Sequence, residues 1–226
     1  MGKALKEHLN CANDLLPTLE AMATASYSSI PNFLVDHGDG TTYARWDSVE
    51  VSKVKYKDKK IILLARDPKD VVVSAYFHKT KRKKKAFNHS FSEFLRDDVG
   101  SLKTYLAFLN SWVNTKEVSD LLIIRYEEMH SDPVARMRSI FDFAGVKDIS
   151  NESIAAAIEF GQFDNMRKLE KSDTLRSDRL RPIDSSDEST YKTRKGEVGG
   201  FVDHLSEDDL VYADSLIKDL DPIFGY

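Results

Sequence analysis

An arginine and a serine eight residues apart form the pair of side chains best suited to bind an anion in this chain. Arg66 follows the aliphatic run 61–65 and precedes Asp67-Pro68, a pair typical of a helix N-cap and first helical position. A helix start offers unpaired backbone N–H groups and a positive dipole end, so Arg66 and Ser74 predict a pocket suited to phosphate. The alternative is a capped strand-to-helix connection whose arginine pairs with a carboxylate.

A second segment, residues 194–201, combines cations with glycines and is called the glycine loop below. Its sequence is Arg-Lys-Gly-Glu-Val-Gly-Gly-Phe. Glycines allow backbone N–H groups to approach a ligand closely, and Arg194 and Lys195 place positive charge beside Gly196. The composition is that of a mobile loop that brings backbone N–H groups and basic side chains to a phosphate.

Together, these segments resemble the cytosolic-type sulfotransferase family, whose members move a sulfuryl group from 3′-phosphoadenosine 5′-phosphosulfate (PAPS) to an acceptor. The resemblance implies that Arg66 and Ser74 bind the 3′-phosphate of this co-substrate. The chain departs from the family pattern at Asp67, where the family carries asparagine, and at the end of the glycine loop, where Gly200-Phe201 replaces Asp-Trp. The resemblance also implies that the phosphate site is completed by Arg194, Lys195 and Gly196.

Further segments follow the family pattern in the same order, so that roughly residues 33–224 align with it. Residues 121–129 resemble the strand that leads into the family's Tyr-Glu-Asp turn, and residues 160–166 resemble its Ser-Phe-x-x-Met segment. The resemblance implies that Tyr126 and Phe163 border the adenine ring. Such a match indicates the fold, whereas activity does not follow from fold.

His37 is the candidate general base. It ends the short run 33–37, where family members carry a Thr-His or Ser-His pair, and Asp36 replaces the hydroxyl residue. An imidazole suits this role because its pKa lies near neutrality and it can accept the proton of an acceptor hydroxyl. The alternative is an ordinary loop histidine. The other five histidines show no metal-ligand spacing, and we expect no metal site.

The family's N-terminal strand and its 5′-phosphosulfate loop, of the type Pro-Lys-Ser-Gly-Thr-Thr-Trp, are not found in this sequence. Residues 1–9 read instead as the helix that follows that loop. The leading hypothesis is a PAPS-dependent sulfotransferase that acts on a small-molecule hydroxyl or amine acceptor. Two alternatives stay open: a catalytically weak or inactive remnant that binds nucleotide or a protein partner, and a shortened form of a longer active enzyme.

Composition and charge argue against several other classes of protein. The formal net charge is −4, which gives no general field for nucleic acid or anionic membranes, and no apolar run approaches the ~20 residues of a spanning helix. The single Cys11 excludes an intramolecular disulfide and a thiolate metal cluster. We therefore expect a cytoplasmic protein that binds neither nucleic acid nor membrane. The basic run 79–85 is interpreted as a solvated loop.

Helical and strand patterns alternate along the chain, which is typical of a parallel sheet with crossover helices. We predict an α/β fold with a P-loop-type parallel sheet flanked by helices, in one sulfotransferase-like domain over residues 1–226 with a flexible lid or linker at 171–193. Predicted strands lie near 32–36, 60–65 and 121–125. Three strands are few for this architecture, which indicates that the first central strand is missing. Predicted helices lie near 2–26, 47–53, 69–80, 91–97, 99–116, 133–144, 151–160 and 206–220.

Overall fold

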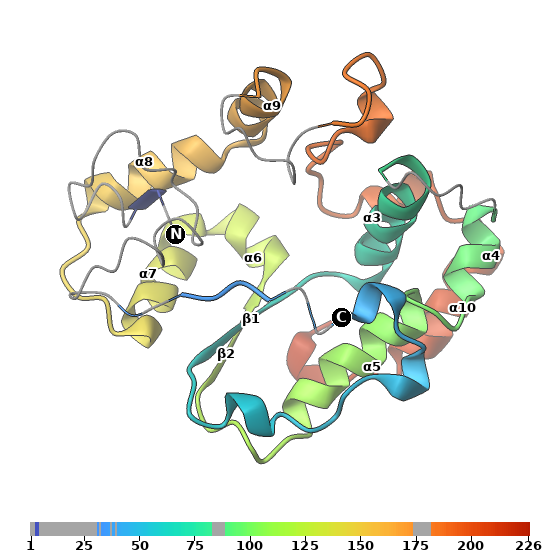
Figure 1. Ribbon diagram of the computed structural model, residues 1–226, viewed down its shortest axis with the longest axis horizontal. Helices are drawn as coiled ribbons and strands as arrows, with labels where there is room; N and C mark the ends of the chain where they lie inside the picture. The colour runs from blue at the N-terminus through green and yellow to red at the C-terminus, as the bar shows by residue number, and fades with distance from the viewer. Residues whose placement is uncertain are drawn as a thin grey trace. The chain divides into compact units, whose positions relative to one another are not determined.

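The computed structural model divides the chain into two compact units (Figure 1). The helical unit is formed by Met1–Asp36 and Glu127–Arg181, and the sheet unit by His37–Tyr126 and Pro182–Tyr226. The helix predicted at 2–26 lies outside the described residues except for Lys3 and Ala4, which are helical. The residues that the structure describes are 3, 4, 31, 33–36, 38, 40–82, 89–173 and 182–226.

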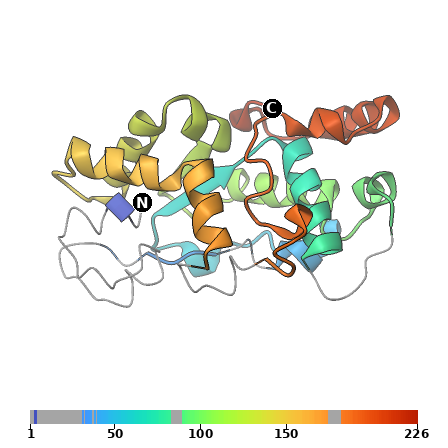
Figure 2. The same cartoon turned by 90° about the horizontal axis from the view of Figure 1, so that it is seen from above.

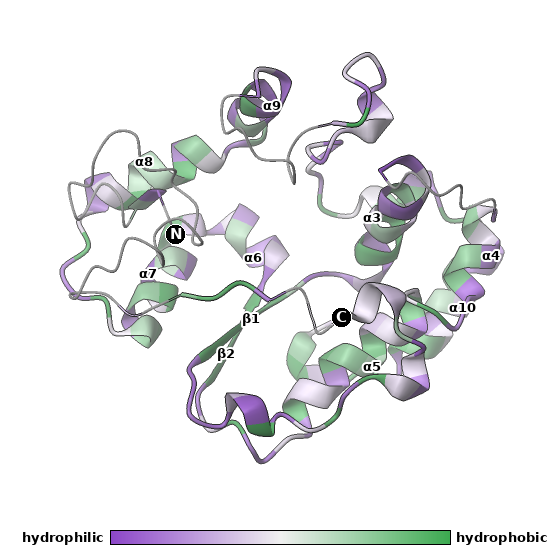
Figure 3. Cartoon of the chain, in the orientation of Figure 1, coloured by the Kyte–Doolittle hydropathy of each residue, from purple (hydrophilic) through white to green (hydrophobic). Residues whose placement is uncertain are grey.

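Two parallel strands form the sheet of the described residues. β1 (Ile61–Ala65) pairs with β2 (Leu121–Arg125) in a register that sets Ile61 opposite Leu121 and Ala65 opposite Arg125. Both strands are aliphatic runs, and Figure 3 shows them as hydrophobic. Because parallel strands end at the same edge of a sheet, the residues that follow β1 and β2 are brought to one place. The two predicted strands near 60–65 and 121–125 are confirmed.

Two residues separate helix α3 (Pro68–Lys81) from β1, and the helix starts at the N-cap that the sequence predicts. The side chain of Asp67 accepts a hydrogen bond of 2.8 Å from the Lys69 backbone N–H, and Pro68 occupies the first helical position. The helix buries Val72 and Val73 in the core and leaves Ser74 exposed. Figure 1 shows this direct passage from β1 into α3.

Helices α4 (Phe91–Arg96), α5 (Leu102–Val113) and α10 (Glu207–Ile217) complete the sheet unit. α5 begins three residues later than predicted because Gly100, with a φ of +60°, and the extended Ser101 precede it. The short 3-10 helices of the unit are Thr41–Tyr43, Trp46–Ser48, Val54–Tyr56, Glu188–Thr190, Gly200–Asp203 and Pro222–Phe224. The core gathers fully buried side chains from β1, α4, α5, α10 and the last 3-10 helix, among them Ala65, Phe94, Leu95, Leu102, Leu109, Ala213 and Phe224.

The helical unit has its own apolar cluster. It contains α7 (Pro133–Ala144), α8 (Asn151–Gly161) and α9 (Phe163–Lys171), and α6 (Tyr126–Ser131) leads into it from β2. The predicted helices near 133–144 and 151–160 are confirmed, whereas α6 and α9 were not predicted. Figure 2 shows α9 turning away from α8 after Gln162, whose backbone is extended. Buried side chains of this cluster are Ala4, Met137, Phe141, Val146, Ile149 and Ile154.

Two predicted elements are wrong in the described residues. Residues 33–36 form no strand, because Phe33 packs against the helical unit's cluster and the segment pairs with neither β1 nor β2. Residues 47–53 are not an α-helix. The Arg45 carbonyl accepts both the backbone N–H and the hydroxyl of Ser48, which closes a single 3-10 turn, and the extended backbone of Val49 ends it.

The first residues of the predicted basic loop also differ from expectation. Lys79 and Lys81 belong to the last turn of α3, and Lys79 is buried, with its Nζ donating to the Val99 carbonyl at 3.0 Å and lying over the Phe94 ring. Burial lowers the pKa of Lys79. The long aliphatic stem of a lysine can fill apolar space while its amine reaches an acceptor, so this cation is part of the core packing. Residues 83–88 lie outside the described part of the chain.

A buried aspartate ties α10 to α4. Burial by itself would raise the pKa of Asp209, but hydrogen bonds from Ser92, Arg96 and Ser206 outweigh it and lower this pKa to about 2. Ser206 and Asp209 also form the capping box that starts α10. The carboxylate therefore holds three donors from two elements, and its charged form is stabilised by the fold.

We expect Asp209→Asn to lower the free energy of unfolding by about 2 kcal/mol at neutral pH. The native state favours the ionised carboxyl, so the contribution is fully present above the ordinary aspartate pKa and is lost as the pH falls toward 2. Urea unfolding of both proteins between pH 7 and pH 3 should show the difference shrinking to about half at the lower limit. Asp208→Asn is the matched control because Asp208 is exposed in the same helical turn. A difference that stays constant with pH would contradict this assignment.

Candidate functional site

Arg66 lies where β1 ends, and the fold fixes both its backbone and its side chain. Its backbone N–H donates to the Tyr105 hydroxyl at 3.0 Å, and that hydroxyl donates to the Arg66 carbonyl at 3.2 Å. Its guanidinium carbon lies 4.4 Å from the ring centroid of Tyr126, the residue that follows β2. The parallel sheet thus brings together two residues that the sequence assigned to one site.

The chain itself provides hydrogen-bond acceptors for only some of the N–H groups of the Arg66 guanidinium. Nη2 donates to Asp70 Oδ2 at 2.9 Å and to the Glu197 carbonyl at 2.7 Å. The carboxylate pair that was the alternative interpretation of Arg66 is therefore present. Nε, however, is buried and has no hydrogen-bond partner in the described structure. A buried donor without an acceptor is costly, so this edge of the guanidinium is suited to an anionic ligand.

Asp70 joins α3 to the glycine loop. It is 4% exposed, and besides Arg66 it accepts the backbone N–H of Gly199 at 2.9 Å and that of Phe201 at 3.0 Å. Gly199 has a φ of +76°, a left-handed conformation that favours glycine and sets up the turn into the short helix Gly200–Asp203. The structure therefore brings the glycine loop to Arg66, as the sequence predicted.

A second anchor holds the chain just before the glycine loop. Arg82, at the end of α3, donates from Nη1 to the Thr190 carbonyl at 3.2 Å. Thr190 is buried, and its hydroxyl donates to the Asp184 carbonyl at 2.7 Å. The loop is thus flanked on both sides by hydrogen bonds to one helix. The predicted lid at 171–193 includes residues 174–181, which lie outside the described part, and its mobility stays a prediction.

Arg194 adds a second cation close to Arg66. Its guanidinium carbon lies 3.9 Å from the Phe77 ring centroid. Burial and then the positive charge of Arg66 lower the pKa of Arg194, while the charges of Glu197 and Asp70 act in the opposite direction. Two neighbouring guanidinium groups that are partly withdrawn from water favour the binding of an anion.

The other predicted residues of the glycine loop and of α3 have different surroundings. The Lys195 ammonium pairs with Asp203 at 2.6 Å on the surface. Gly196 has a φ of +68°, so a side chain at this position would be strained. Ser74 lies one turn beyond Asp70 on α3 and is exposed. It therefore shares the face of α3 from which Asp70 bonds the loop.

Two predicted site residues cannot be related to Arg66 in this structure. His37 lies outside the described residues. Phe163 opens α9 in the helical unit and is 37% exposed. Sequence reasoning missed Asp70 and Tyr105 as parts of the site. The spacing of four residues from Arg66 to Asp70 was the available signal for the first of these.

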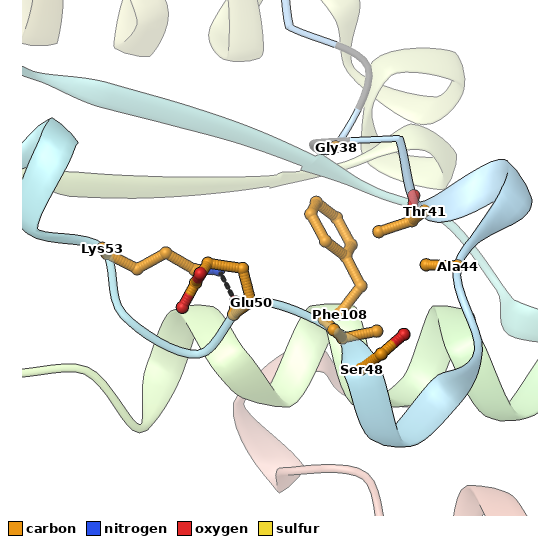
Figure 4. Close-up of a pocket in the computed structure, with 8 residues that line it drawn as sticks. Gly38, Thr41, Ala44, Ser48, Glu50, Lys53 and Phe108 are labelled. Atoms are coloured by element: carbon orange, nitrogen blue, oxygen red, sulfur yellow. Dashed lines mark hydrogen bonds between the residues drawn. The ribbon is translucent and has the colours of Figure 1, made fainter.

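Residue 38, directly after His37, lines a small pocket in the sheet unit (Figure 4). The Phe108 ring faces this space, and the buried Lys53 donates from Nζ to the Glu50 carbonyl at its edge. Lys53 also lies 4.8 Å from the Trp112 ring centroid. The pocket is lined by Gly38, Thr41, Ala44, Ser48, Val49, Glu50, Lys53 and Phe108.

Within the described residues, no group of three or more histidine, cysteine or acidic side chains is placed to hold a metal ion, and no helix is long and apolar enough to cross a membrane.

The structure thus places a strand-end arginine beside a cationic glycine loop on a parallel sheet, and comparison with known proteins identifies the family. Residues 7–220 match the sequence model of the Sulfotransferase domain. The chain therefore belongs to this family. This confirms the predicted family and the predicted class of fold, an α/β structure with a parallel sheet flanked by helices.

Named relatives extend the comparison. Sulfotransferase 2A1 of Macaca fascicularis is 27% identical over 151 residues, which are 65% of this chain and 51% of that protein. The 3-beta-hydroxysteroid sulfotransferase of Cavia porcellus is also 27% identical over 151 residues, 65% of this chain and 50% of that protein. The chain thus spans about half the length of the curated relatives it matches.

Solved structures show the same fold. Mouse sulfotransferase SULT7A1, complexed with PAP, matches with a TM-score of 0.60 and 25% identity over 77% of this chain and 62% of that one. Retinol dehydratase in a complex with retinol and PAP matches with a TM-score of 0.55 and 25% identity over 74% of this chain and 50% of that one.

We expect Tyr105→Phe to lower the free energy of unfolding by about 1 to 2 kcal/mol, because it removes both hydrogen bonds to the Arg66 backbone. Chemical denaturation of the two proteins measures the difference. Tyr212→Phe is the control, since it removes the same oxygen from a ring that lies over Arg96. Equal stability of the Tyr105 variant and the wild type would show that these bonds contribute nothing net.

Proposed function

We propose that this domain binds PAPS and transfers its sulfuryl group to a small-molecule acceptor. The observation that carries the proposal is the buried Nε of Arg66, which has no partner in the described structure and lies beside a second guanidinium and the glycine loop. A phosphate oxygen is an acceptor that such a donor fits. The family and the PAP complexes of the similar structures support the identity of the nucleotide.

In this proposal the 3′-phosphate of the nucleotide binds at the end of β1. Arg66 donates from Nε, and the exposed hydroxyl of Ser74 donates from the next turn of α3. Arg194 supplies a second charge-assisted contact. Tyr126, already stacked on Arg66, borders the adenine. The remaining contacts of the phosphate come from Lys195 and Gly196.

The chemistry needs a base as well as a nucleotide site. PAPS, when bound, supplies an activated sulfuryl group. His37 takes the proton of the acceptor hydroxyl, which a neutral imidazole can do near pH 7. Gly38, which lines the small pocket of the sheet unit, directly follows this base in the sequence. This adjacency supports the pocket as one wall of the acceptor site.

The acceptor in this proposal is a small molecule with a hydroxyl or amine group. Among the relatives, one is named as a 3-beta-hydroxysteroid sulfotransferase, and retinol dehydratase was solved with retinol. An apolar body with one hydroxyl is therefore the first class of acceptor to test. We place the reaction in the cytoplasm, as the resemblance to cytosolic-type enzymes suggests.

We expect the protein to bind PAP, the 3′-phosphoadenosine 5′-phosphate product, more tightly than adenosine 5′-phosphate. Arg66→Ala should weaken PAP binding by about one to two orders of magnitude, because a charge-assisted hydrogen bond contributes roughly 1.5 to 3 kcal/mol. Isothermal titration with both nucleotides measures this. The matched control is Arg45→Ala, which removes an exposed arginine that also pairs with aspartates. Equal and weak binding of the two nucleotides would contradict the proposed 3′-phosphate site.

We expect His37→Ala to reduce sulfation of the acceptor by at least about 100-fold, the lower range of general-base contributions, while PAP affinity stays within a factor of two. A turnover assay with labelled PAPS and a panel of steroid and retinoid alcohols measures the first quantity. His89→Ala is the control, since His89 is exposed on the loop before α4. PAP binding by the wild type without any turnover would favour the nucleotide-binding remnant instead.

A further inference from the structure

Asp70 contacts both Arg66 and the glycine loop, the two parts of the candidate phosphate site. It lies in the first turn of α3 and reaches back to Arg66 and across to Gly199 and Phe201, which are 129 and 131 residues further along the chain. We propose that Asp70 is the positioning residue of the 3′-phosphate site. The inference rests on the proposed function, because it concerns the recognition of the same phosphate.

The burial of Asp70 indicates that its contacts are strong. Burying a carboxylate to 4% exposure is costly unless hydrogen bonds and an opposite charge compensate for the lost water. Here one guanidinium N–H and two backbone N–H groups do so at 2.9 to 3.0 Å. Each of these donors belongs to a segment that the proposed phosphate site uses.

Asp70 fixes the direction of Arg66. A guanidinium is planar and rigid, so holding one of its nitrogens and stacking its face sets the direction of all its N–H bonds. Nη2 is held by Asp70 and by the Glu197 carbonyl, and the face lies on Tyr126. The unpartnered Nε is therefore aimed by these contacts.

Asp70 also fixes the end of the glycine loop. Its two oxygens accept the N–H groups of Gly199 and Phe201, so the loop is held from its C-terminal side by bonds between groups of the chain itself. Ordering a loop before the ligand arrives reduces the entropy that binding must overcome. The same carboxylate thus orients the arginine and orders the loop that carries the second cation, Arg194.

The test compares Asp70→Asn with the wild type. The amide keeps the size of the side chain but retains only one acceptor oxygen, so it cannot hold Arg66, Gly199 and Phe201 together. We expect the Kd for PAP to rise about tenfold and the Kd for adenosine 5′-phosphate to change less than twofold. Asp70→Glu keeps the charge and moves the carboxylate by one methylene, and we expect it to shift the ratio of the two Kd values in the same direction.

Asp214→Asn is the charge-matched control, because Asp214 pairs with Lys69, the neighbour of Asp70, and is 57% exposed. It removes one negative charge near the start of α3 and leaves the bonds of Asp70 intact. We expect a ratio of the two Kd values equal to that of the wild type. Thermal unfolding of each variant shows whether it is folded.

A second measurement needs no nucleotide. Amide hydrogen exchange of the nucleotide-free wild type should show Gly199 and Phe201 protected, and in Asp70→Asn their exchange should accelerate at least tenfold. Exchange of both amides at the rate of an unstructured chain in the wild type would overturn the proposal.

The outcomes separate this inference from the proposed function. Tighter binding of both nucleotides by Asp70→Asn would show that the carboxylate acts only by repelling phosphate, and an unchanged ratio of Kd values would show that it does not position the site. Either result overturns the inference. If the wild type does not distinguish PAP from adenosine 5′-phosphate, the proposed function fails and with it the phosphate role of Asp70, whereas the exchange data still decide whether Asp70 orders the loop.

Discussion

The parallel pairing of β1 with β2 is the constraint on which the site depends. It brings the residues that follow the two strands, Arg66 and Tyr126, to the same edge of the sheet, and a ring then lies against a guanidinium. An antiparallel pair would send these residues to opposite edges. The start of α3 at the same edge adds the dipole of a capped helix, so strand direction and helix start together define the position of the candidate anion site.

Around that edge, the chain balances buried charge between segments that are distant in sequence. The positive charge of Arg66 lowers the pKa of Arg194, and the negative charges of Glu197 and Asp70 act in the opposite direction. Neighbouring cations that keep some of their N–H donors unused are a common feature of anion sites, since the repulsion between the cations is relieved when an anion binds. Asp209, between α4 and α10, is likewise a buried charge that is compensated by donors from two segments of the chain.

The sequence predicted the parts of the fold that have local causes. Asp67 accepts the hydrogen bond expected of an N-cap, and two aliphatic runs are the two strands. The pairing of strands is not local: residues 33–36 have the composition of a strand, but Phe33 packs against the helical unit's cluster and the segment pairs with neither strand. The helix α9 is short and largely polar. In the site, Arg66 and the glycine loop were found from composition. Asp70 was not, because an aspartate in a first helical turn is ordinary until its distant partners are seen.

The glycine loop is attached to α3 at both ends, by Arg82 through the Thr190 carbonyl and by Asp70 through Gly199 and Phe201. Opening of the loop away from α3 therefore requires that one of these two attachments break. Arg82 donates to a neutral carbonyl, whereas the buried carboxylate of Asp70 accepts two N–H groups of the loop, so we expect the attachment at Thr190 to be the weaker of the two.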